Sequence, residues 1–253
     1  MISVRTAMLS EPGGREAKEV GCGWWNQEAH LCAVLADGAG GHQGGQVASR
    51  LAVRALLARF SQTPAATAAE LAALVRETNR AVLDGRASSP GLAEMYTTIV
   101  CLSADLRQGT ISWAHCGDSR LYWFRDGRLV ERTRDHSLVQ ALVDAGVLEE
   151  EQLRTHPRRS TLQSALGMQE GELTLAAQPG SRPIEGANVF LLCSDGVWEH
   201  LSDATLEDLL GRAGSPDYWL AAIGSSIAQA VRPDATHDNY TALAVWLTGA
   251  LDD

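Results

Sequence analysis

A run of six apolar residues, from Leu31 to Ala36, stops abruptly at an aspartate and is followed by a glycine-rich segment. The whole segment reads Asp37-Gly38-Ala39-Gly40-Gly41-His42. The apolar run predicts a buried strand, and the glycines allow the backbone to approach a ligand closely. Carboxylate and backbone carbonyl oxygens are the ligands that Mg²⁺ and Mn²⁺ take. The stretch therefore predicts either a site for a hard metal and a phosphate or a tight turn that closes a strand.

The overall composition is that of an acidic globular protein. The chain has 253 residues and a formal net charge of −10, with a pI near 5.2. Nucleic acids and anionic membranes bind basic surfaces, so neither is an expected partner. No internal repeat or low-complexity linker divides the chain, and we therefore expect one domain over residues 1–253.

Cysteine usage and the lack of targeting signals bear on the cellular compartment. The five cysteines are odd in number and show no C-x-x-C spacing, which predicts buried, reduced thiols. The N-terminus has no apolar signal core, and no window approaches the roughly 20 apolar residues of a membrane span. We therefore expect a cytoplasmic protein.

Hydrophobic patterning predicts a mixture of antiparallel strands and helices. The expected strands cover residues 17–25, 29–36, 96–104, 110–116, 120–124, 172–177, 188–193 and 240–247. The expected helices cover residues 46–60, 64–82, 137–145, 203–211 and 217–231. A polar interval around residues 138–160 interrupts the strands and is expected to form an inserted surface flap.

Four aspartates share one local context, because each stands where a predicted strand meets a turn. They are Asp37, Asp118, Asp195 and Asp238. For any one of them, turn formation through its own side chain is a sufficient explanation. Four carboxylates brought together would repel one another unless a cation neutralised them. The repeated pattern therefore favours a site for two metal ions.

Six short motifs, in order along the chain, resemble those of the metal-dependent Ser/Thr protein phosphatases of the protein phosphatase 2C type (PPM), bacterial branch. The motifs D-G-x-G-G-H, M-G-T-T, G-D-S-R, T-x-D-H-S, C-S-D-G and D-N-x-T are matched by segments 37–42, 95–98, 117–120, 133–137, 193–196 and 238–241. The resemblance implies an α+β fold. Two antiparallel sheets form a β-sandwich flanked by α-helices in four α-β-β-α layers, with the metal site at one end.

The resemblance also implies a set of metal ligands and their roles. Asp37 would bridge two ions, Asp195 and Asp238 would complete the first ion's protein ligands, the Gly38 carbonyl and Glu19 would serve the second, and Asp118 would hold a third, weaker ion. The ions would be Mn²⁺ or Mg²⁺. Their bridging hydroxide would attack the phosphorus of phosphoserine or phosphothreonine in line, without a covalent phosphoenzyme.

Two further residues and the partners follow from the same resemblance. His42 matches the candidate general acid for the leaving oxygen, although a solvated loop histidine is the alternative. Arg15 would take the substrate phosphate in a fork. The expected partners are a phosphorylated protein and a bacterial Ser/Thr kinase or its target, and we expect a monomer. The segment around residues 14–25, together with Ala39, is similar to phosphatases associated with type VI secretion.

The first family motif, R-x-x-N-E-D, is only partly kept. Arg15 and Glu19 match it, but Lys18 stands in place of Asn and Val20 in place of Asp. Loss of a carboxylate that accepts hydrogen bonds from metal-bound water predicts weaker metal binding at the second site or slower turnover. In M-G-T-T, Tyr96 stands where the family has glycine.

Two alternative functions, and the role of the flap cations, stay open from the sequence. The departures at Lys18 and Val20 suggest a catalytically weakened relative that binds phosphoproteins as a regulator. A phosphatase that acts on the phosphoserine of an anti-sigma antagonist has the same sequence features. The flap cations either favour acidic or multiply phosphorylated substrates or belong to a solvated helix and turn; they are Arg154, His156, Arg158 and Arg159.

Overall fold

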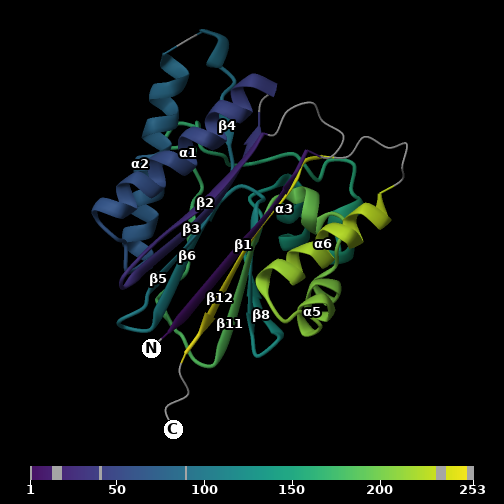
Figure 1. Cartoon of the computed structure of the whole chain (residues 1–253). Coiled ribbons are helices and arrows are strands. Elements are labelled where there is room, and N and C mark those ends of the chain that lie inside the picture. The colour runs from purple at the N-terminus through teal and green to yellow at the C-terminus, as the bar shows by residue number, and fades with distance from the viewer. Residues whose placement is uncertain (1, 13–18, 40–41, 89, 232–237, 250–253) are drawn as a thin grey trace.

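A computed structural model describes residues 2–12, 19–39, 42–88, 90–231 and 238–249 of the chain. Two antiparallel sheets pack against each other, and helices cover the outer side of each one (Figure 1). A five-stranded sheet can be traced in the described residues. In spatial order it contains β1 (Ser3–Glu11), β12 (Tyr240–Thr248), β11 (Ala187–Cys193), β7 (Arg120–Arg125) and β8 (Arg128–Arg132).

The second sheet has seven strands within the same described ranges. Its main path runs through β10 (Arg182–Pro183), β6 (Thr110–Cys116), β5 (Ile99–Asp105), β3 (His30–Ala39) and β2 (Val20–Gln27). Two short strands, β4 (Tyr96–Thr97) and β9 (Ala176–Ala177), pair with β3 and β6 respectively. The predicted architecture of two antiparallel sheets flanked by helices is confirmed.

Strand β3 shows how the sequence builds the layers. Its side chains alternate between the two faces of the sheet, as the strand geometry requires. Leu31 and Leu35 are buried against the other sheet, where Phe190 and Leu243 also lie. The intervening Cys32 and Val34 face the helices instead. Because both faces are covered, the strand reads as a continuous apolar run rather than an alternating pattern.

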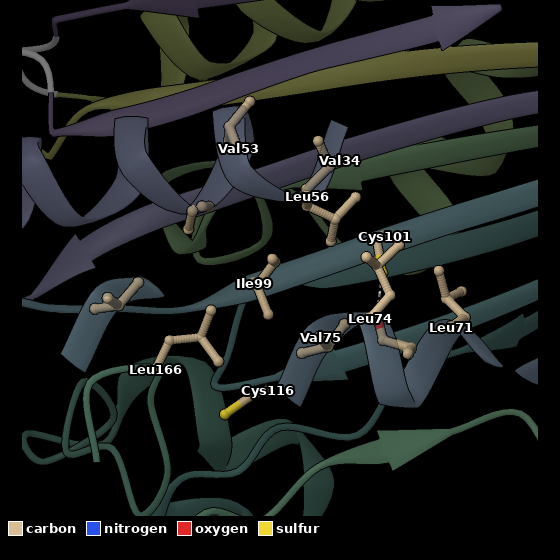
Figure 2. Close-up of a cluster of buried hydrophobic side chains, with 14 of the residues drawn as sticks. Val34, Val53, Leu56, Leu71, Leu74, Val75, Ile99, Cys101, Cys116 and Leu166 are labelled. Carbon is tan, nitrogen blue, oxygen red and sulfur yellow. Dashed lines mark hydrogen bonds between the residues drawn. The ribbon is translucent and has the colours of Figure 1, made fainter. Parts of the chain in front are cut away.

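Two long helices cover the seven-stranded sheet. They are α1 (His42–Gln62) and α2 (Ala68–Ala87), and α2 begins with a capping box formed by Thr67 and Glu70. Figure 2 shows the cluster they bury, in which Val53 and Leu56 of α1 approach Val34 of β3. This packing fixes the start of α1 next to the end of β3, where the glycine-rich segment lies.

The five-stranded sheet has its own helical cover. The short α4 (Asp195–Trp198), α5 (Asp203–Gly211) and α6 (Pro216–Ala230) follow β11 along the chain. Helix α3 (Leu138–Asp144) and the 3-10 helix η2 (Glu150–Thr155) also pack here, because their Val139 and Leu153 join the same buried cluster. A further 3-10 turn, η1 (Pro90–Leu92), precedes β4.

The predicted strands omit three that the structure contains, β1, β8 and β10, and overextend another. Ser3–Glu11 is β1, which pairs along its whole length with β12 and had not been predicted. The predicted strand over residues 172–177 was wrong for most of its length, because only Ala176–Ala177 pairs with β6. The first helix begins at His42 rather than Gln46, directly after the glycines.

The cysteine prediction holds with one correction. All five cysteines are free, and four are buried, but Cys22 is only half-buried on the edge strand β2. In the part of the chain that the structure describes, no helix has the length and apolar character needed to cross a bilayer. A single domain over 1–253 and a flap at 138–160 stay predictions.

Candidate active site

Asp37 lies at the rim of the space between the two sheets. It continues the series of β3 side chains that faces the other sheet, and its cross-strand neighbour is Val20 of β2. The Asp37 N–H donates to the Thr98 hydroxyl at 3.0 Å, and its carbonyl accepts from the Thr98 N–H at 2.8 Å. The Thr97 hydroxyl donates to the same carbonyl at 2.8 Å. Three hydrogen bonds from Thr97 and Thr98 therefore fix the backbone of Asp37.

Gly38 allows β3 to touch the first turns of α1. A Cβ atom on Gly38 would lie 2.3 Å from the carbonyl group of Gly45, a distance that no real side chain adopts. Gly38 also pairs with Thr97 of β4, and its N–H donates to the Glu19 carbonyl at 3.2 Å. Any larger residue at position 38 would separate the strand from the helix. The glycine requirement predicted from the sequence thus has a packing cause.

Glu19 connects the two sheets at this end. Its residue surface is 4% exposed, and its N–H donates to Oδ1 of Asn239 at 2.9 Å across 220 positions of sequence. The Glu19 carbonyl accepts from the hydroxyl of Ser49 in α1 as well as from Gly38. The predicted second-site ligand Glu19 is therefore brought beside both the Asp37 segment and the Asp238-Asn239 segment.

Asp195 and Asp238 come together at the matching end of the five-stranded sheet. Ser194, directly before Asp195, and Thr241, three residues after Asp238, are joined by two hydrogen bonds of 3.0 and 3.1 Å. A Cβ on Gly196 would lie 2.3 Å from the Asn239 carbonyl, so the start of α4 presses on the start of β12. Asp195 and Asp238 thus lie on two abutting backbone segments.

Asp118 occupies the connection between β6 and β7, which joins the two sheets. The neighbouring Ser119 hydroxyl bonds to the Thr98 hydroxyl at 2.7 Å, which links this turn to Asp37. Asp118 is buried, and burial raises the pKa of its carboxyl well above the usual range. The charges of Asp195 and Asp135 raise that pKa further, so Asp118 is within electrostatic range of both carboxylates.

These contacts test whether the residues suit a metal. Hydrogen bonds and a close backbone contact link the segments that carry Asp37, Glu19, Asp195, Asp238 and Asp118 at one end of the sandwich. Among the described residues, no three histidine, cysteine, aspartate or glutamate side chains are grouped closely enough to hold a metal by themselves. The available donors are hard oxygens of carboxylates and of the Gly38 backbone, which suit Mg²⁺ or Mn²⁺ with water as additional ligands. Burial is the main reason that the pKa of Asp118 is raised, with smaller contributions from Asp195 and Asp135, and a bound cation would favour the ionised carboxylate there.

A buried ion pair, which the sequence analysis did not predict, packs next to Asp118 and helps to fix the position of its backbone. Nε and Nη2 of Arg120 each donate to a carboxylate oxygen of Asp135 at 2.8 Å, and these side chains are 2% and 1% exposed. The Arg120 guanidinium also lies 3.8 Å from the centre of the Trp198 ring. Trp198 in turn donates from its indole nitrogen to the Asp118 carbonyl at 2.9 Å. The G-D-S-R and T-x-D-H-S motifs thus meet through this cluster.

His136 has a structural position next to the same turn. Its Nδ1 accepts from the Gly117 N–H at 3.2 Å, and its ring stacks on His115 at 4.7 Å between centroids. His115 bonds through Nε2 to the Arg134 carbonyl at 2.7 Å. Burial, with a smaller contribution from His115, lowers the pKa of His136 to about 4. A neutral His136 therefore holds the backbone just before Asp118.

Several predicted site residues lie outside the described parts of the structure. Arg15 and Lys18 fall within residues 13–18, and the side chain of His42, the first residue of α1, is also outside them. Their roles therefore stay predictions. Tyr96 is described and is accommodated by packing, since its ring lies 4.3 Å from the guanidinium carbon of Arg86.

The four flap cations divide between different surroundings. Arg154 forms an ion pair with Asp203 of α5 at 3.5 Å, Arg158 is exposed, and Nδ1 of His156 accepts from the Arg158 N–H at 3.1 Å. Arg159 instead pairs with Glu199, directly after α4. The two sequence-based interpretations of this segment, recognition of acidic substrates and simple solvation, both stay predictions.

Comparison with known proteins agrees with the sequence motifs and the fold. The family model described as Protein phosphatase 2C matches residues 21–217. The chain is 40% identical over 179 residues to the "Serine/threonine protein phosphatase PstP" of Mycobacterium tuberculosis, which covers 70% of this chain and 34% of that relative. This chain thus matches about a third of the length of that curated relative.

Two solved structures extend the comparison over nearly the whole chain. The catalytic domain of PstP in complex with 2 manganese ions has a TM-score of 0.80 and 29% identity, with 98% of this chain and 100% of that one covered. "PppA, a key regulatory component of T6SS in Pseudomonas aeruginosa" has a TM-score of 0.74 and 30% identity, with 96% of each chain covered. The predicted family and the predicted fold are both confirmed, and the chain belongs to the bacterial branch of the protein phosphatase 2C family.

Proposed function

We propose that this protein is a metal-dependent phosphatase that hydrolyses phosphoserine and phosphothreonine in proteins. The observation that carries the proposal is the linkage of five carboxylate-bearing segments from both sheets at one end of the sandwich. The names of its relatives support the reaction, and the manganese complex of PstP supports the class of cofactor.

The proposed ligands keep the roles that the family resemblance implies. Asp37 would contribute to both ions, Asp195 and Asp238 would hold the first, and Glu19 with the Gly38 carbonyl would hold the second. Asp118 is proposed for a third, weaker ion, for which its raised pKa is the support. Bound Mn²⁺ or Mg²⁺ supplies positive charge for the phosphoryl group and a water acidic enough to act as a nucleophile at neutral pH.

The remaining steps are proposed for side chains of the chain itself. Arg15 binds two oxygens of the substrate phosphate and orients it for in-line attack. His42 donates a proton to the leaving seryl or threonyl oxygen. His42 is the first residue of α1, and the contact of Gly45 in that helix with Gly38 supports this role, because it places the start of α1 beside the end of β3.

The decisive assay measures hydrolysis of a phosphothreonine peptide and of p-nitrophenyl phosphate with and without Mn²⁺. We expect metal-dependent turnover that falls at least about a hundredfold in Asp37→Ala and in Asp195→Ala, since each change removes a ligand. Asp217→Ala is the matched control, because Asp217 is an exposed carboxylate at the start of α6. Turnover without added or bound metal, or full activity in both site variants, would contradict the proposal.

The rival function, a regulator that binds phosphoproteins without hydrolysis, is less well supported. The proposed first-site ligands are retained in the sequence, and the compared relatives are named as phosphatases or as a regulatory component. Binding of a phosphopeptide without measurable turnover in Mn²⁺ would favour the rival.

For the biological role, we propose that the protein reverses a bacterial Ser/Thr kinase in the cytoplasm as a monomer. The five free cysteines support a reducing compartment. The similarity to PppA supports a role in type VI secretion, alongside the sequence similarity around residues 14–25. Comparison of the phosphoproteomes of a deletion strain and its parent would identify the substrate, and unchanged phosphorylation of secretion components would exclude that role.

A further inference from the structure

The flap segment makes a specific contact with the helix that begins at Asp195. Nε of Arg159 donates to Oε1 of Glu199 at 2.6 Å, and Nη2 donates to Oε2 at 2.9 Å. This is a bidentate ion pair between the planar guanidinium and the planar carboxylate, and it fixes the orientation of the guanidinium as well as its position. The Arg159 and Glu199 side chains are 35% and 11% exposed, so the pair is partly shielded from water.

The pair lies next to two of the proposed metal ligands. The Glu199 N–H donates to the Asp195 carbonyl at 2.9 Å, which places Glu199 one helical turn after Asp195 and on the same face. Gly196 in turn abuts Asn239, the neighbour of Asp238. The hydrogen bond with Glu199 raises the pKa of Arg159, and the charges of Asp195 and Asp238 raise it further. The guanidinium is therefore within electrostatic range of both carboxylates.

A fixed positive charge near a metal site weakens the binding of a cation there, and a neighbouring negative charge offsets this effect. Glu199 should therefore strengthen metal binding in two ways. Its negative charge attracts the cation directly, and it neutralises the positive charge of Arg159. The partial shielding of the pair limits the screening of both charges by salt.

We propose that Arg159 and Glu199 form a charge pair that sets the metal affinity of the Asp195 and Asp238 half of the site. The inference rests on the proposed function, because it takes these aspartates as metal ligands. It assigns the flap segment a role in metal binding, in addition to any contact with the substrate.

The test is calorimetric titration of the full chain with Mn²⁺ for the wild type and four variants. In Arg159→Gln we expect Mn²⁺ to bind about 3- to 10-fold more tightly, because a like charge is removed. In Glu199→Gln we expect binding to weaken by about the same factor. The double variant should return to within about 2-fold of the wild type. Thermal unfolding of each variant checks that it is folded.

Arg128→Gln is the matched control for net charge. Arg128 also pairs with a glutamate, Glu207, at 2.5 Å, but it follows the hairpin at the opposite end of β7 from Arg120 and Asp118. Its Mn²⁺ affinity should stay within about 1.5-fold of the wild type. An equal change in Arg128→Gln and Arg159→Gln would overturn the proposal.

The signs of the effects separate a charge pair from a purely structural contact. If the pair only held the segment in place, Arg159→Gln and Glu199→Gln would change the affinity in the same direction or not at all, and either result overturns the inference. Such a result in a wild-type protein that binds Mn²⁺ and hydrolyses phosphopeptide would leave the proposed function intact. A wild type that neither binds Mn²⁺ nor shows phosphatase activity would overturn both.

Discussion

The two sheets support the candidate site by different interactions. On the seven-stranded side, neutral hydroxyl and amide groups of Thr97 and Thr98 hold the backbone of Asp37. On the five-stranded side, the buried pair of Arg120 with Asp135, together with Trp198, supports Asp118. The seven-stranded half of the site thus depends on several neutral hydrogen bonds, and the five-stranded half depends on one buried cluster of charged side chains.

This difference has a consequence for tolerance to mutation. A neutral hydrogen bond contributes about 0.5–1.5 kcal/mol to stability, so the hydroxyl contacts can be lost singly at moderate cost. Removing one partner of a buried ion pair leaves a charge without compensation and costs about 3–5 kcal/mol. The five-stranded half should therefore be the more sensitive to single substitutions.

The largest expected effect is that of Asp135→Asn. The change leaves the guanidinium of Arg120, which is 2% exposed, without a charged partner. We expect the free energy of unfolding in urea to fall by about 3–5 kcal/mol. Arg125→Gln, which disrupts a half-exposed pair of 3.5 Å with Glu185, is the control and should cost less than about 1 kcal/mol. Equal losses of unfolding free energy in Asp135→Asn and Arg125→Gln would show that the buried ion pair is no more important for stability than an exposed one.

The next effect concerns pH and His136. Its folded pKa of about 4 lies below the ordinary value of 6.5, so the folded state favours the neutral ring. The corresponding stability is fully present above about pH 6.5 and falls as the pH decreases towards 4, by roughly 2–3 kcal/mol.

The measurement for His136 is the free energy of unfolding at several pH values between 7 and 4, for wild type and His136→Asn. An asparagine oxygen can still accept from the Gly117 N–H but does not titrate in this range. The variant should therefore lose less stability on acidification than the wild type, which corrects for the carboxylates common to both. Identical pH dependence in the two proteins would show that His136 does not carry this effect.

A smaller effect is expected for Thr98→Val on the seven-stranded side. Valine has nearly the same shape but no hydroxyl to accept from Asp37 or to bond with Ser119. We expect a loss of about 1–2 kcal/mol in the free energy of unfolding, clearly below that of Asp135→Asn. If the two substitutions cost the same, the two halves of the site do not differ in the way described.

The smallest effect concerns the replacement of a family carboxylate by Val20. Val20 is the cross-strand neighbour of Asp37 and packs at the edge of the core between the sheets. An aspartate there would face the Asp37 side and restore an acceptor for metal-bound water. We expect Mn²⁺ to bind about 3- to 10-fold more tightly to Val20→Asp in calorimetry, whereas Val20→Asn, without the charge, should gain less. Equal affinities in wild type and Val20→Asp would exclude a deficit at this position.

Local sequence patterns predicted most of the fold because apolar runs and turn residues act over short distances. Strand β1 was not predicted because nearly all residues of Ser3–Glu11 are exposed or half-exposed and the segment lacks a clear apolar alternation. The predicted strand at 172–177 failed because only its last two residues find a partner on β6. In both cases pairing with a distant segment decided the structure.

The candidate ligands could be predicted because each stands in a short, recognisable context, such as Asp37 before glycine. The interactions that support them could not, since they join residues that are far apart in the chain. The bond between Glu19 and Asn239 spans 220 positions, and that between Trp198 and Asp118 spans 80. Arg120 and Asp135 were present in quoted motifs, but nothing local indicated that they bind each other.

The most direct test of the site is the number of Mn²⁺ ions bound by wild type, Asp37→Asn and Asp217→Asn in calorimetric titration. If both sheets build one metal site around Asp37, the wild type and the exposed control should bind two ions with high affinity. Asp37→Asn should lose high-affinity binding of both, because it removes the shared ligand. Two high-affinity ions in Asp37→Asn, as in the wild type, would contradict a site centred on Asp37.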